Sequence, residues 1–128
     1  MSFLNRIRNA SANQHNSWKI LNDSSQLDEI DEISTSKPVV IFKHSTSCGT
    51  SAFAKHGMEA EWDFEDADLD FFYLDLLRYR SVSNEVASHY SVVHQSPQIL
   101  LIKDGKAIYD TSHFNVNIGS IKKALASV

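Results

Sequence analysis

The chain contains one cysteine, Cys48, in the segment HSTSCGTSA that runs from His44 to Ala52. Small polar residues surround it, and a run of apolar residues precedes it. Cysteine attacks other sulfur atoms as the thiolate, so its surroundings decide whether it reacts. The alternative is an inert, buried side chain, which is what most single intracellular cysteines are. The polar neighbours favour a nucleophile, and we take Cys48 as the candidate catalytic residue.

Cys48, Gly49, Thr50 and Ser51 have the spacing of a Cys-x-x-Cys redox motif, with a hydroxyl in place of the second thiol. An internal disulfide therefore cannot form. A lone thiol can enter a mixed disulfide with a small thiol or a protein, and an external thiol must then release it. We expect these residues to form the thiolate and substrate site, with Ser51 donating a hydrogen bond to the thiolate and Gly49 allowing another backbone to come close.

Lys43 and His44 lie at the end of the apolar run before Cys48. Either side chain is a candidate for favouring the thiolate or for binding a carboxylate of a thiol co-substrate. Side chains alternate along a strand, so these two point to opposite faces and we do not expect both to serve. A solvated strand end or a satisfied core histidine is the structural alternative for each.

The composition excludes several classes of partner. The 128 residues carry a net charge of −4, with 42% hydrophobic and 22% charged residues, as in a single globular domain. We therefore expect neither nucleic acid nor membrane as a partner. The six histidines have no spacing typical of a metal site, so no metal is expected. A lone thiol suits a reducing compartment, and we predict a cytoplasmic monomer or weak dimer.

The hydrophobic pattern predicts an alternating α/β order. Strands are expected at residues 17–21, 38–44 and 69–76 and in both halves of 97–113, and helices at 22–34, from Cys48 onward, at 81–92 and at 115–128. Asp104 and Gly105 mark the turn of the last hairpin, and Gly57 is expected to weaken or kink the helix after Cys48. The order β-α-β-α-β-α-β-β-α is that of a thioredoxin-like fold, a central mixed sheet flanked by helices. Residues 1–16 are expected to form an arm before a single domain at 17–128.

In this order Cys48 lies where a central strand passes into a helix, the place at which open α/β sheets bind ligands. The unpaired N–H groups and the positive end of the helix favour a negative sulfur by up to roughly 2 kcal/mol. Both the position and the residue type therefore predict a reactive thiolate.

Ser96 and Pro97 precede the apolar run of the hairpin, about fifty residues after Cys48. Proline is tolerated at the first residue of a strand, and thioredoxin-like folds place a cis-proline there, facing the active thiol. A cis bond would leave the backbone of Ser96 able to pair with an extended thiol ligand. We expect Ser96, Pro97 and Gln98 to line the ligand groove.

The motifs VVIFKHSTSC, SNEVA, VVHQSPQILLI and Ser112-His113 follow one another at family-like separations. With them the chain resembles, from about Trp18 to its end, the YtxJ family of bacilliredoxin-like monothiol proteins. The resemblance implies a thioredoxin fold and removal of bacillithiol from S-bacillithiolated proteins, with Cys48 as the attacking thiol. Where that family commonly has Cys-Pro-Ile-Ser, this chain has Cys-Gly-Thr-Ser, which is similar to the Cys-Gly-Phe-Ser of monothiol glutaredoxins.

These observations predict a monothiol thiol-disulfide oxidoreductase that acts on S-thiolated client proteins. No cofactor is expected to stay bound, and the co-substrate is a low-molecular-weight thiol, bacillithiol or glutathione. Two alternatives remain. One is an iron–sulfur cluster carrier, in which Cys48 from two chains and two small thiols hold a [2Fe–2S] cluster. The other is a thioredoxin-like binding module without catalysis.

Overall fold

The computed structural model describes residues 17–128, and the arm expected at residues 1–16 lies outside the described residues. The elements are β1 (Trp18–Ile20), α2 (Gln26–Ile33), β2 (Val39–His44), α3 (Gly49–Glu61), β3 (Asp70–Asp75), α4 (Arg80–Tyr90), β4 (Gln98–Lys103), β5 (Lys106–Ser112), the 3₁₀ turn η1 (His113–Asn115) and α5 (Ile118–Ala126). The predicted order of strands and helices is confirmed.

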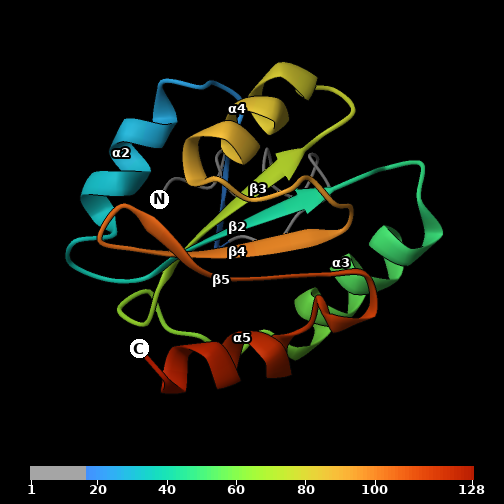
Figure 1. The fold of residues 1–128 in the computed structure, drawn as a ribbon. Helices are drawn as coiled ribbons and strands as arrows, with labels where there is room; N and C mark the ends of the chain where they lie inside the picture. The colour runs from blue at the N-terminus through green and yellow to red at the C-terminus, as the bar shows by residue number, and fades with distance from the viewer. Residues whose placement is uncertain (1–16) are drawn as a thin grey trace, which may run out of the picture.

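The five strands form one mixed sheet in the order β1-β3-β2-β4-β5. The strands β1, β3 and β2 run parallel, and β4 and β5 run antiparallel to their neighbours. Figure 1 shows α2 and α4 on one face of this sheet and α3 and α5 on the other. The central strand β2 is thus covered on both sides, which explains its continuous apolar run.

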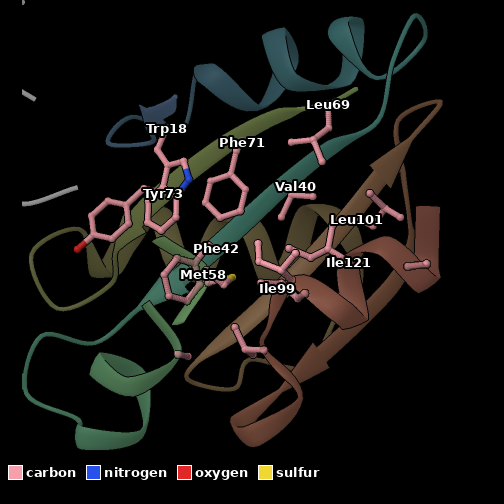
Figure 2. Packing of buried hydrophobic residues seen from close by; sticks show 14 residues of the cluster. Trp18, Val40, Phe42, Met58, Leu69, Phe71, Tyr73, Ile99, Leu101 and Ile121 are labelled. Carbon is pink, nitrogen blue, oxygen red and sulfur yellow. The ribbon is translucent and has the colours of Figure 1, made fainter. Parts of the chain in front are cut away.

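Side chains of β2 alternate between two hydrophobic cores. Val40 and Phe42 pack with α3 and α5, in the cluster that Figure 2 shows, while Val39 and Ile41 pack with α2 and α4. Each fully buried side chain of this size stabilises the fold by about 1.5–3 kcal/mol. Because both faces of β2 are fixed in this way, the residues that follow its last position have a rigid support.

The edge strand β1 has three residues, of which Trp18 is the buried one. The Trp18 ring stacks on Phe71 with centroids 4.5 Å apart, and the ring of Trp62 meets it edge-on at 5.8 Å. These contacts bury the indole in the core that lies beneath α3, as Figure 2 shows for Trp18 and Phe71.

Two local expectations have different outcomes. The hairpin between β4 and β5 turns at Asp104 and Gly105, which have φ values of 52° and 74°, as a tight turn with two left-handed residues requires. Gly57 was expected to weaken or kink α3, and the helix continues through this residue to Glu61 without interruption. Packing of Ala54 and Met58 into the core holds the helix on both sides of the glycine.

The pairing of β2 with β4 decides what lies beside the candidate site. These strands are antiparallel, with Lys43 opposite Gln98. The chain that leaves β2 after His44 and the chain that enters β4 before Gln98 therefore meet at the same end of these two inner strands. Cys48 and Pro97, which are far apart in sequence, belong to these two segments.

Candidate active site

Cys48 occupies the N-cap position of α3, with extended backbone angles of φ −109° and ψ 123°. Its N–H donates to the carbonyl of Ser45 at 3.2 Å, and its carbonyl accepts from the N–H of Ala52 at 3.0 Å. The side chain is partly exposed, forms no disulfide and makes no capping hydrogen bond. The structure thus places the thiol at the junction of strand and helix, within reach of solvent.

The first turn of α3 presents unpaired backbone donors beside this thiol. Within the described part of the chain, the N–H groups of Gly49, Thr50 and Ser51 have no hydrogen-bond acceptor, as is usual in the first turn of a helix. Their partial positive charge favours a negative sulfur at the N-cap. No acidic residue lies in this turn to oppose the effect.

The hydroxyl of Ser51 is fully buried and has other partners than the thiol. Its Oγ accepts from the N–H of Ser45 at 3.0 Å and lies 2.7 Å from Nδ1 of His44. The expected hydrogen bond from Ser51 to Cys48 is not formed. The residue at the place of a second cysteine instead ties α3 to the end of β2, and so fixes the loop that carries Cys48.

His44 and Lys43 lie on opposite faces of the sheet, as alternation predicts. The His44 ring is buried beside Phe42 and Tyr73, each with its centroid 5.7 Å away. Burial and then the charge of Lys55 lower the pKa of His44 below its ordinary value, despite the opposing effect of Asp75. The ring is therefore neutral at neutral pH.

Lys43 is completely buried on the face covered by α4. Its Nζ donates to the carbonyl of Ser83 at 3.2 Å and lies 3.2 Å from Nδ1 of His94. Burial lowers the pKa of Lys43 from 10.5 to about 8. With no exposed surface, Lys43 does not fit the expected role of binding a carboxylate of a co-substrate. It supports the segment before Pro97 instead.

The segment before β4 forms the other side of the site. The peptide bond between Ser96 and Pro97 is cis. Among the described residues, the backbone N–H and carbonyl of Ser96 make no hydrogen bond, and its buried Oγ also has no partner. Gln98 differs from the expectation, because its side chain is buried and its amide donates to the carbonyl of Val93 at 2.9 Å. Gln98 thus braces the loop and does not line a groove.

Three exposed apolar side chains near this edge were not predicted. Phe53 on α3, Val93 before Pro97 and Phe114 in η1 are exposed by 75%, 80% and 79%. The turn η1 packs against α3 and is joined to the Pro97 carbonyl by the N–H of His113 at 3.0 Å. In the sequence these residues fit the apolar periodicity of ordinary elements, so no signal set them apart.

Two expectations about other classes of site can be compared with the described residues. Within residues 17–128, no group of three or more His, Cys, Asp or Glu side chains is arranged to hold a metal ion. No helix in the same range has the length and apolar character that crossing a membrane requires.

Comparison with known proteins assigns the family. The sequence profile of the family described as monothiol bacilliredoxin BrxC matches residues 19–121. The chain belongs to this bacilliredoxin family. Its single cysteine agrees with the monothiol description.

Solved structures agree with this assignment. A candidate oxidoreductase with a thioredoxin fold superposes with a TM-score of 0.72 at 26% identity, covering 84% of this chain and 93% of the other. Thioredoxin from Malassezia sympodialis gives 0.68 at 18% identity, with 87% and 90% covered, and thioredoxin from Fasciola hepatica gives 0.65 at 20%, with 85% and 97% covered. The two thioredoxins show the fold alone. The predicted thioredoxin fold is confirmed, and this bacilliredoxin is a monothiol redox protein.

Proposed function

We propose that this bacilliredoxin removes a low-molecular-weight thiol from protein mixed disulfides, and that bacillithiol is that thiol. The observation that carries the proposal is the state of Cys48, a partly exposed thiol at the start of α3 with no second cysteine in the chain. A dithiol protein would close an internal disulfide. A monothiol protein instead keeps the small thiol until another thiol takes it away.

The reaction is a pair of thiol-disulfide exchanges. The Cys48 thiolate attacks the sulfur of the small thiol in the client's mixed disulfide, that S–S bond breaks, and the client leaves as a thiolate that takes a proton from solvent. Cys48 is then joined to the small thiol. A second thiolate attacks the same small-thiol sulfur, forms a new disulfide with it and returns Cys48 as the thiolate. Each step exchanges one disulfide for another, so no further oxidant or reductant is needed.

The protein's own groups support this sequence of steps. The free amides of Gly49, Thr50 and Ser51 favour Cys48 both as attacking and as leaving thiolate. The unpaired backbone of Ser96 can accept an extended segment beside the thiol, through main-chain hydrogen bonds of the β type. Apolar Phe53, Val93 and Phe114 offer contact area for a client polypeptide at this edge.

The test is direct. A purified client protein carrying bacillithiol on its cysteine is mixed with the wild-type bacilliredoxin. The intact masses of the client and of the bacilliredoxin are then followed with time by mass spectrometry. We expect the client to lose the adduct while Cys48 gains it. Cys48→Ser should be inactive, and Ser47→Ala, which changes a neighbouring side chain, should behave as wild type. Release by Cys48→Ser would overturn the assignment of the nucleophile.

A parallel experiment separates the redox reaction from cluster transport. The protein is incubated anaerobically with iron, sulfide and the small thiol, and its visible absorption is recorded. The proposal predicts no stable coloured species. A dimer with the absorption of a [2Fe–2S] cluster, lost in Cys48→Ser, would favour a cluster carrier.

A further inference from the structure

A small polar cavity lies along α3, beginning next to the loop that carries Cys48. Its volume is about 320 Å³, at the lower end of the range of small-molecule sites. The lining residues are His44, Thr46, Ala52, Lys55, His56 and Glu59. Thr46 is two residues before Cys48, and Ala52, His56 and Glu59 follow it at helical spacing, on the same side of the helix. We call this cavity the α3 pocket.

Lys55 is the fixed charge of the α3 pocket. The residue is almost fully buried, and its Nζ lies 3.1 Å from the carboxylate of Glu59. The same ammonium lies 6.0 Å from the centre of the Trp18 ring and 5.9 Å from that of Tyr73. These rings come from β1 and β3, so two strands of the sheet hold the cation in place. An immobilised, partly desolvated ammonium favours an anionic ligand.

His44 supplies the second polar group of the pocket. Its Nδ1 lies 2.7 Å from the Ser51 hydroxyl oxygen, and its ring forms part of the pocket wall. His56 adds an exposed imidazole one turn along the helix from Ala52. Among the described residues, the pocket thus combines one ammonium and two imidazoles with one carboxylate, that of Glu59.

We propose that the α3 pocket binds a carboxylate of the small thiol that is joined to Cys48, with Lys55 as its charged contact. The inference rests on the proposed function and adds to it the residues that hold a carboxylate of the small thiol. The distance fits. Seven residues of helix separate Cys48 from Lys55, a rise of about 10 Å. A thiol compound with the length of three extended residues spans about the same distance.

Substitution of Glu59 tests the inference in the opposite sense from substitution of Lys55. Its carboxylate forms an ion pair with Lys55, so the carboxylate of a ligand must compete with Glu59 for the ammonium. Removing the charge of Lys55 should weaken the preference for acidic thiols. Removing the charge of Glu59 should strengthen that preference. If Lys55 and Glu59 only stabilised the fold, substituting them would change the stability of the protein but not its preference for acidic thiols.

The experiment measures exchange equilibria with two small disulfides and no client protein. Protein is equilibrated with the disulfide and thiol of glutathione, a compound of three residues that carries two carboxylates, or of glutathione diethyl ester, in which both carboxylates are esterified. The Cys48 adduct is quantified by intact mass. In the reaction the Cys48 proton passes to the released thiol and one disulfide replaces another. The ratio of the two equilibrium constants, compared between variants, cancels the intrinsic chemistry of the probes.

We expect Lys55→Gln to lower this ratio about tenfold, the size of one charge-assisted hydrogen bond. Glu59→Gln should raise it, and Lys55→Arg should keep it near the wild-type value. Lys122→Gln is the matched control, because Lys122 forms a 2.6 Å ion pair with Asp63 outside the pocket. Adduct formation with glutathione diethyl ester shows that Cys48 of each variant is reactive, and the circular dichroism spectrum shows that each variant is folded.

The outcomes separate this inference from the proposed function. An equal ratio in wild type, Lys55→Gln and Glu59→Gln would overturn the role of the α3 pocket while leaving Cys48 as a nucleophile. Failure of the wild-type protein to form an adduct with either probe would overturn the proposed function and the inference with it. If Lys55→Gln does not fold, Glu59→Gln and Lys55→Arg carry the test.

Discussion

Lys43 allows a quantitative prediction, because burying its ammonium lowers the free energy of unfolding and a substitution can remove that loss. No carboxylate of the described residues pairs with it, and its donors face the Ser83 carbonyl and His94. Lowering its pKa from 10.5 to about 8 corresponds to about 3 kcal/mol of lost stability at neutral pH. Methionine has a similar shape and carries no charge. Lys43→Met should remove this cost and lose about 1 kcal/mol of hydrogen bonding, for a net stabilisation of about 2 kcal/mol.

The sign of the pH dependence follows from the same shift. The cost of Lys43 is fully present below about pH 8, where the ammonium is charged in the folded and unfolded states. Stability attributable to Lys43 rises between about pH 8 and 10.5, since there only the unfolded chain holds the proton. The advantage of Lys43→Met should therefore nearly disappear by about pH 10.

Urea unfolding followed by tryptophan fluorescence, at pH 7 and pH 10, measures both effects. Lys106→Met is the control, because Lys106 is an exposed residue at the start of β5, and its substitution should change stability by less than about 0.5 kcal/mol. The reasoning would be refuted if Lys43→Met were less stable than wild type at pH 7, or if its advantage were the same at both pH values.

Three further substitutions test particular contacts. Ser51→Cys should allow an internal disulfide with Cys48, seen as a loss of two hydrogens in the intact mass, and the small-thiol adduct should then no longer accumulate; a persistent adduct would contradict this. Tyr90→Phe removes the 2.7 Å hydrogen bond from Tyr90 to Asp31, and we expect urea unfolding to show a loss of about 1 kcal/mol. Gly105→Ala places a side chain at φ 74°, which should cost about 1–2 kcal/mol, and unchanged thermal unfolding would argue against strain at this turn.

The sequence was informative where one physical rule governs the outcome. The apolar run of β2 and the small polar residues after it place Cys48 at a strand-to-helix junction, because a buried parallel strand must be followed by a crossover. Alternation along the strand separates Lys43 from His44 for a similarly simple reason. Both features depend only on neighbours in the chain.

The contacts of single side chains depend on residues that the fold brings together from distant segments. Ser51 bonds to His44 and Ser45, and no rule of spacing chooses these partners over the thiol. The Gln98 side chain donates to the carbonyl of Val93 in the loop before it. Predicting this contact requires knowing the conformation of that loop. Lys55 resembles an ordinary surface lysine in the sequence. It is buried because Trp18 and Tyr73 approach it from two strands.

The central claim is that folding makes Cys48 a reactive thiolate by placing it at the N-terminus of α3. The rate of its alkylation by iodoacetamide at pH 7 measures this directly when the folded protein is compared with the same protein unfolded in urea. The account predicts faster alkylation in the folded protein, because the free amides at the start of α3 stabilise a negative sulfur. A folded protein that is alkylated more slowly than the unfolded chain would contradict it.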